Sequence, residues 1–272
     1  MNHKLLITSL FSLTFLILDN FLLCSCYDFL TVCSNKYRCG TIEADFPFIG
    51  GDRPDGCGYP GLKLSCEKDK TTINIKDVKY QVSDLNQEAQ TLRIARADFM
   101  DGICSPRYRN TSLDTELFDY LLGSTDITLV YGCPSDVNFL VPNGFKCSRE
   151  RGFVLLGNPG SNGGGVCRSV VNARVEMSDA DFSEDIFNVS ALEKALREGF
   201  GVKYKVDIQG CEDCKKSGGV CGYDINLSQT TCYCANRLSV SGVKTCNTST
   251  TATESGSQME TPENESGTGL SN

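Results

Sequence analysis

Tryptophan is absent from this chain of 272 residues, and histidine occurs once, at His3. His3 lies in a segment that we expect to be removed on export, which leaves the mature protein without histidine. Ser-His and Cys-His nucleophiles and imidazole acid–base catalysis are therefore excluded. No cluster of Lys and Arg indicates nucleic-acid binding, and no apolar run after the first 25 residues is long enough to cross a bilayer. We predict no catalytic residue, no metal and no cofactor.

The N-terminus has the pattern of a secretory signal peptide. Lys4 precedes an apolar run over Leu5–Leu18, and small residues follow near Ser25. Hydroxyl residues interrupt this run, and it is short for a membrane span, which needs roughly 20 mostly apolar residues. We therefore predict a signal peptide over residues 1–25 and a protein secreted to the extracellular space and cell wall.

Secretion determines how the cysteines are interpreted. The chain has 16, of which Cys24 and Cys26 lie at the expected cleavage zone. An even number remains from Cys33 onward, which in an oxidising compartment indicates a disulfide framework rather than thiolate metal ligands. Spacing alone leaves the pairing open for the first eight of them, Cys33, Cys39, Cys57, Cys66, Cys104, Cys133, Cys147 and Cys167.

The end of the chain differs from the rest in composition. Residues 247–272 contain Glu but neither Lys nor Arg, and they are rich in Ser and Thr. Such a segment lacks the apolar residues for a core, and we predict a disordered acidic tail. Five sequons agree with export and predict N-glycosylation; they are Asn110, Asn188, Asn226, Asn247 and Asn264.

Residue patterns predict a mainly β fold with one clear helix near residues 190–200, that is, α+β. In the first part, period-two alternation favours strands over Leu62–Cys66, Thr72–Val82 and Gln90–Phe99. Further strands are expected over 126–131, 153–156, 173–175 and 202–208. The helix is expected over Ser190–Gly201, with Ser190 and Glu193 forming a capping box. We expect two small disulfide-rich β units, the second ending in a Cys-rich module.

Several motifs resemble a known family. In the first unit they are Cys39-Gly40, Phe46-Pro47-Phe48, Cys57-Gly58, Pro60-Gly61-Leu62 and Leu64-Ser65-Cys66. In the second they are Tyr131-Gly132-Cys133-Pro134, Gly199-Phe200 and the cysteine pattern from Cys211 to Cys234. Together they resemble the ectodomain of plant wall-associated and leaf-rust-resistance-locus-type receptor-like kinases. Ile49 stands where that family usually has Trp. The motifs of a kinase are absent from this sequence, so we do not expect an enzyme.

The resemblance implies domain ranges and disulfides. It implies a galacturonan-binding-like β domain over 27–104 and a wall-associated receptor kinase C-terminal-like domain over 105–246, with a Cys-rich module over 211–246. That module ends as epidermal-growth-factor-like modules do. This analogy implies the pairs Cys211–Cys221, Cys214–Cys232 and Cys234–Cys246.

The resemblance also implies binding of a cell-wall polysaccharide, pectic galacturonan. A polyuronate requires cations for its carboxylates and flat apolar surfaces for its sugar rings. The candidates in the first unit are Arg38, Phe46, Phe48, Arg53 and Tyr59. Core packing is the competing interpretation for the two phenylalanines, and a solvated surface or a local ion pair is the competing interpretation for the two arginines.

Other functions stay open. The chain could be a protein-interaction module, such as a secreted decoy or co-receptor that pairs with a membrane receptor kinase. It could also be the ectodomain of a receptor that lost its membrane span and kinase, which would move it to the plasma membrane. Rising ionic strength should weaken polyuronate binding but not an apolar protein interface. No pair of acids is singled out for a glycosidase.

Overall fold

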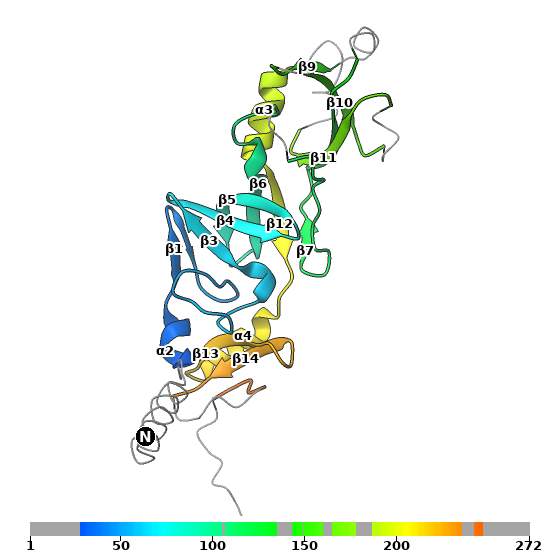
Figure 1. The fold of residues 1–272 in the computed structure, drawn as a ribbon. Helices are drawn as coiled ribbons and strands as arrows, with labels where there is room; N and C mark the ends of the chain where they lie inside the picture. Colours follow the sequence, from blue (N-terminus) through cyan, green and yellow to red (C-terminus); the bar gives the residue numbers. More distant parts are fainter. Residues whose placement is uncertain are drawn as a thin grey trace, which may run out of the picture.

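The computed structural model describes residues 28–104, 107–134, 143–148, 150–159, 165–177, 187–235 and 242–246. The molecule is elongated (Figure 1): a six-stranded sheet occupies its middle, a four-stranded sheet with a helix lies at one end, and a small Cys-rich module lies at the other. The predicted signal peptide, the tail, Asn247 and Asn264 lie outside the described residues. Among the residues that are described, no helix is long and apolar enough to span a membrane.

The central sheet has the strand order β3-β4-β5-β6-β12-β7. Its strands are β3 (Leu64–Glu67), β4 (Lys70–Ile75), β5 (Val78–Asn86), β6 (Thr91–Arg96), β12 (Phe200–Tyr204) and β7 (Phe118–Tyr120). Alternate residues of each strand point to one face, where they form the main apolar core with side chains such as Ile73, Tyr80 and Ile94. The other face of β3, β4 and β5 carries polar residues, as expected for an antiparallel sheet with one solvated side.

The prediction of a single strand over Thr72–Val82 is wrong. This segment is a hairpin in which Ile75 pairs with Val78 across a two-residue turn. Lys76 in the turn has a φ of 51°. The buried apolar positions are odd-numbered before the turn and even-numbered after it, so the alternation slips by one residue at the turn. That phase change is the sequence signal of the hairpin.

The N-terminal elements pack against this sheet and are fixed by two disulfides. They are α2 (Phe29–Ser34), β1 (Tyr37–Cys39), β2 (Ile42–Ala44) and the short 3-10 helix η1 (Pro60–Leu62). Cys33 pairs with Cys57, and Cys39 pairs with Cys66. The Phe46–Pro47 peptide bond is cis.

The second sheet has the strand order β11-β8-β10-β9. Its strands are β8 (Thr125–Tyr131), β9 (Gly144–Lys146), β10 (Arg151–Leu156) and β11 (Ser169–Val175). Helix α3 (Val189–Glu198) covers it with Leu192 and Leu196, beside Phe99 of the 3-10 helix η2 (Ala97–Phe99). Cys104–Cys147 and Cys133–Cys167 cross-link this part.

Helix α3 confirms the predicted helix but not its predicted cap. Asn188, not Ser190, caps the first turn, because its side chain accepts a hydrogen bond from the Ser190 backbone N–H. The helix ends at Gly199, whose φ of 73° suits glycine. A Cβ at Gly199 would lie 2.0 Å from the carbonyl oxygen of Ile94, so the chain approaches β6 closely there.

The Cys-rich module consists of a helix and a hairpin. Helix α4 (Ile208–Lys216) lies on the strands β13 (Val220–Asp224) and β14 (Gln229–Tyr233). We predicted a strand over 202–208, but β12 ends at Tyr204, and Asp207 caps α4 by accepting from the Gly210 N–H. The disulfides are Cys211–Cys221, Cys214–Cys232 and Cys234–Cys246, the same pairs that the resemblance implies.

Hydrogen bonding crosses the domain boundary that we predicted at residue 104. Strand β12 pairs with β6, and β7 pairs with β12, so two strands from the second predicted unit complete the sheet of the first. A sequence pattern detects strands but not their partners, and here the partner of β6 lies about a hundred residues further along the chain.

A cationic pocket as the candidate functional site

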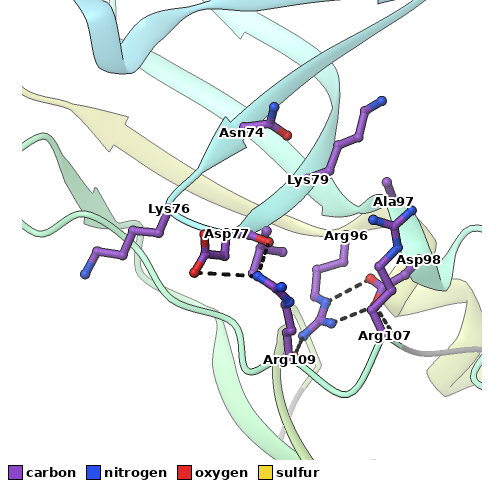
Figure 2. A pocket seen from close by; sticks show the side chains of 10 residues that line it. Asn74, Lys76, Asp77, Lys79, Arg96, Ala97, Asp98, Arg107 and Arg109 are labelled. Atoms are coloured by element: carbon purple, nitrogen blue, oxygen red, sulfur yellow. Dashed lines mark hydrogen bonds and ion pairs between the residues drawn. The ribbon is translucent and has the colours of Figure 1, made fainter.

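A pocket of about 360 Å³ opens where the β4–β5 hairpin meets the chain that follows η2 (Figure 2). Its lining residues are Asn74, Lys76, Asp77, Val78, Lys79, Arg96, Ala97, Asp98, Arg107 and Arg109. Five of these are basic and two are acidic. In a chain whose net charge is −8, this is a local excess of positive charge.

One wall of the pocket is built on a buried ion pair. Arg96 is 3% exposed, and it donates from Nε and Nη2 to the two carboxylate oxygens of Asp98, at 3.0 and 2.7 Å. Its Nη1 donates to the carbonyl oxygens of Arg109 and Asn172, at 2.6 and 3.3 Å. The Arg107 backbone N–H donates to Asp98 at 3.0 Å. The pair therefore fixes the backbone that carries Arg107 and Arg109.

The charge state of Asp98 follows from these contacts. Burial by itself would raise the pKa of this carboxyl, because it penalises the anion. The hydrogen bonds from Arg96 and the Arg107 N–H outweigh burial and hold the pKa of Asp98 below its ordinary value. Asp98 is thus ionised at neutral pH and offsets the charge of Arg96, so Arg96 is a structural cation of the pocket.

The remaining cations are more available. Lys79 contacts Glu67 at 2.5 Å. The contact between Arg109 and the Asp77 carboxylate is long, at 3.5 Å, and both side chains are largely exposed. The exposed side chains of Lys76 and Arg107 form no ion pair with any residue that the structure describes. An incoming anion could therefore meet Lys76, Arg107 and Arg109 without breaking a buried contact.

Arg53, one of the five predicted ligand-binding residues, is inside the fold. Its side chain is 2% exposed, and burial lowers the pKa of its guanidinium. It donates to the carbonyl oxygens of Phe48 and Cys57 at 3.1 and 2.9 Å, and also to those of Cys33 and Asn35. All of its nitrogens are used, so Arg53 has nothing to offer a polysaccharide carboxylate in this structure.

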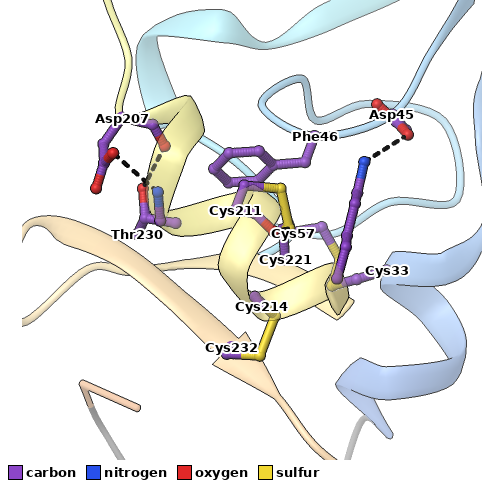
Figure 3. Close-up of a disulfide and its surroundings, with 12 residues drawn as sticks. Cys33, Asp45, Phe46, Cys57, Asp207, Cys211, Cys214, Cys221, Thr230 and Cys232 are labelled. Atoms are coloured by element: carbon purple, nitrogen blue, oxygen red, sulfur yellow. Dashed lines mark hydrogen bonds and ion pairs between the residues drawn. A yellow bond between two sulfur atoms is a disulfide. The ribbon is translucent and has the colours of Figure 1, made fainter. Parts of the chain in front are cut away.

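The two phenylalanines are also buried, as the core-packing interpretation holds. Phe48 is fully buried and packs edge-on against Tyr204 at 5.2 Å between ring centroids. Phe46 is 5% exposed and lies against the Cys211–Cys221 disulfide of the Cys-rich module (Figure 3). Phe48 packs on Tyr204 of β12 and Phe46 packs on the Cys-rich module. Neither ring has a free face for a sugar ring.

Tyr59 and Arg38 keep some exposure. Tyr59 is half-buried; its hydroxyl lies 3.0 Å from Oγ1 of Thr230, and its ring lies 4.5 Å from that of Tyr223. Arg38 is exposed and donates to Glu43 at 2.9 Å, the local ion pair of the competing interpretation. A ligand-binding role for these two residues stays a prediction. The structure does not bring Arg38 to the cationic pocket.

The sequence contains one local signal for this pocket. Arg107 and Arg109 alternate on either side of Tyr108, close after Cys104. The expected boundary at residue 104 places them in a different unit from Lys76 and Lys79. Only the folded chain shows that these cations share one pocket.

Comparison with known proteins gives two domain matches. The family model described as wall-associated receptor kinase galacturonan-binding matches residues 33–96, and the model described as wall-associated receptor kinase C-terminal matches residues 147–237. No kinase-domain model matches the chain, and no solved structure matches it.

Similar curated proteins come from Arabidopsis thaliana. Leaf rust 10 disease-resistance locus receptor-like protein kinase-like 1.3 is 33% identical over 71% of this chain, which is 28% of the relative's length. The 2.4 protein is 33% identical over 70% of this chain and 30% of its own length. The 2.8 protein is 31% identical over 79% of this chain and 23% of its own length. The shared region is the one that carries the two domains, and on this evidence the chain belongs to the family of wall-associated and leaf-rust-resistance-locus-type receptor-like kinase ectodomains.

Proposed function

We propose that this protein binds pectic galacturonan of the plant cell wall and that the cationic pocket receives the carboxylates of the polysaccharide. The observation that carries the proposal is the group of exposed cations at Lys76, Arg107 and Arg109. It stands beside the match of residues 33–96 to a domain described as galacturonan-binding. We further propose that the protein acts outside the cell, in the wall, as its disulfides and predicted signal peptide favour.

The chemistry of the pocket suits a uronate. Guanidinium groups pair with carboxylates through two parallel hydrogen bonds, and an ammonium adds a compact charge. Asp77 and Asn74 supply acceptors, and Asn74 also supplies donors, for sugar hydroxyl groups. A pocket of about 360 Å³ lies at the lower end of the usual range for small ligands, so it fits a short piece of a chain rather than a large folded partner.

The expected affinity is modest, because the cations are exposed. A solvent-exposed ion pair contributes about 0.2–1 kcal/mol. Tight binding therefore requires several such contacts along one polymer, and it should weaken as salt rises, since the Debye length is about 8 Å at physiological ionic strength. Strong retention in high salt would instead favour the protein-interaction alternative.

The test is binding of the purified glycosylated protein to oligogalacturonates, measured by calorimetry at two salt concentrations. Arg107→Gln together with Arg109→Gln removes two cations, and we expect about 2- to 30-fold weaker binding from the loss of two exposed ion pairs. Lys194→Gln, on the exposed side of α3, is the matched control. Arg38→Gln tests the site predicted from the sequence in the same assay.

The outcomes separate clearly. Weakening in the double variant alone supports the pocket, whereas weakening in Arg38→Gln alone moves the site to the β1–β2 hairpin. Failure of the parent protein to bind any oligogalacturonate, or binding that salt leaves unchanged, contradicts the proposal.

A further inference from the structure

The outer face of β3, β4 and β5 continues from the cationic pocket. Residues that point inward from these strands, such as Ile73, Ile75 and Tyr80, belong to the main core. Their neighbours therefore point outward. The outward residues are Ser65, Glu67, Lys70, Thr72, Asn74, Lys79, Gln81 and, past the irregularity in β5, Asp84, and of these Thr72 is buried. This face has no apolar side chain, but it has hydroxyl, amide and charged groups along its length.

Strand β4 gives this face a direction. Asn74 lines the pocket, and Lys70 lies four residues earlier on the same side of the strand. At about 3.3 Å per residue the two positions are about 13 Å apart. Lys70 is exposed and forms no ion pair within the described part of the chain. A second available cation therefore lies beyond the pocket, in line with it.

Two acids lie on this face, Glu67 of β3 and Asp84 of β5, and Glu67 is the one opposite Lys70. Glu67 is directly opposite Lys70 in the β3–β4 register, yet its carboxylate contacts Lys79 of β5. Lys79 lines the pocket, and its partner Glu67 is opposite Lys70. The Lys79–Glu67 pair therefore lies between the pocket and Lys70. Both side chains are partly exposed, and a ligand carboxylate can compete with Glu67 for Lys79.

We propose that an extended polyuronate chain leaves the pocket and runs along the outer face of β4, where Lys70 binds a further carboxylate. This inference rests on the proposed function and specifies which part of the surface the polymer follows. Between the pocket and Lys70, the exposed side chains of Asn74 and Ser65 offer hydrogen bonds to sugar hydroxyl groups, whereas Thr72 is buried and its hydroxyl faces the Ser65 carbonyl oxygen. The competing interpretation is an ordinary solvated sheet face, on which Lys70 contributes nothing to binding.

The two interpretations differ in how affinity depends on ligand length. The backbone of Lys70 is about 13 Å from that of the pocket residue Asn74, which exceeds one Debye length at physiological salt, so Lys70 should have little effect on a short oligomer held beside Arg107 and Arg109. An oligomer long enough to reach Lys70 gains one more ion pair, which corresponds to about a 1.5- to 5-fold gain in affinity. The gain in affinity should therefore begin at an intermediate length of the oligogalacturonate.

The experiment measures binding of oligogalacturonates of graded length to the parent protein, Lys70→Gln, Glu67→Gln and the control Lys194→Gln. We expect Lys70→Gln to match the parent for the shortest oligomers and to bind the longer ones about 1.5- to 5-fold more weakly. Glu67→Gln frees Lys79 and removes a repulsive charge, so it should bind the longer oligomers more tightly than the parent. Thermal melting of each variant checks that the exposed substitutions leave the fold intact.

Each result has one meaning. If Lys70→Gln equals the parent at every length, or is weakened equally at every length, the path along β4 is refuted. If the parent and the pocket variants behave as proposed above while Lys70→Gln does not, only this path fails. If the parent binds no oligogalacturonate of any length, the proposed function fails and this inference fails with it.

Discussion

Replacing Arg53 by Ala separates a structural role from a ligand-binding role. In the folded chain this guanidinium joins four backbone carbonyls, those of Cys33, Asn35, Phe48 and Cys57. These carbonyls belong to the end of α2, the residue after it and the loop between β2 and β3. Removing the side chain leaves all four acceptors without this donor in a region that is largely buried.

The size of the effect can be reasoned from these contacts. A hydrogen bond to a charged group contributes about 1.5–3 kcal/mol, but several to one side chain are not additive. Burying the guanidinium has its own cost, which is the cause of its lowered pKa, and the variant is relieved of that cost. We therefore expect Arg53→Ala to lower the free energy of unfolding by about 3 kcal/mol, a large value for a single substitution.

Urea unfolding followed by far-ultraviolet circular dichroism, with the disulfides intact, measures this change. Arg38→Ala is the matched control, because its exposed pair with Glu43 should contribute no more than about 1 kcal/mol. The reasoning is refuted if Arg53→Ala unfolds within about 0.5 kcal/mol of the parent. If that variant is as stable as the parent and binds oligogalacturonate less well, Arg53 contacts the ligand after all.

Two further predictions concern the pocket wall and the Cys-rich module. Because the pKa of Asp98 is lowered on folding, its contribution to stability is present above the unfolded pKa of about 4 and is lost as pH falls through the folded pKa. Asp98→Asn should therefore be less stable than the parent at pH 7, with the difference shrinking below about pH 4 in urea unfolding curves; a difference that does not depend on pH would contradict this. Gly219→Ala would place a Cβ 2.4 Å from Sγ of Cys232 and 2.6 Å from Sγ of Cys246. We expect mispaired disulfides in peptide maps of this variant, and native pairing at the parent's yield would show that the module tolerates the methyl group.

Local signals allowed much of the fold to be predicted. The helix near 190–200 has an apolar side and a terminal glycine within one short stretch, and the structure confirms the helix, with Asn188 rather than Ser190 as its cap. Several strands also lie where alternation favours them. The hairpin at Lys76 was missed because both of its strands alternate and only the phase changes at the turn. The residues that pair across the sheet, such as Ile94 with Phe200, leave no local mark in the sequence.

The candidate site was harder to predict, and the two arginine positions show why. Arg53 and Arg109 both lie in irregular segments among polar neighbours, and their sequence contexts do not distinguish them. The difference is made by the carbonyl groups of Cys33 and Asn35, about twenty residues away, which help to bury Arg53, and by the Arg96–Asp98 pair, which holds the backbone of Arg109 at the surface. Whether an arginine is structural or available depends on the tertiary environment, and composition does not encode it.

The Arg96–Asp98 pair also explains why the pocket depends on both predicted units. Arg96 is the last residue of the match to the galacturonan-binding model, whereas Arg107 and Arg109 lie beyond it. The same guanidinium donates to the carbonyl of Asn172, on β11 of the second sheet, so the pocket wall is fixed from that side as well. A chain that ends at residue 104 would lack these two arginines and also β12, the partner of β6. It follows that the cationic pocket is a property of the two units folded together, and that any carboxylate binding retained by the first unit alone would have to use other cations.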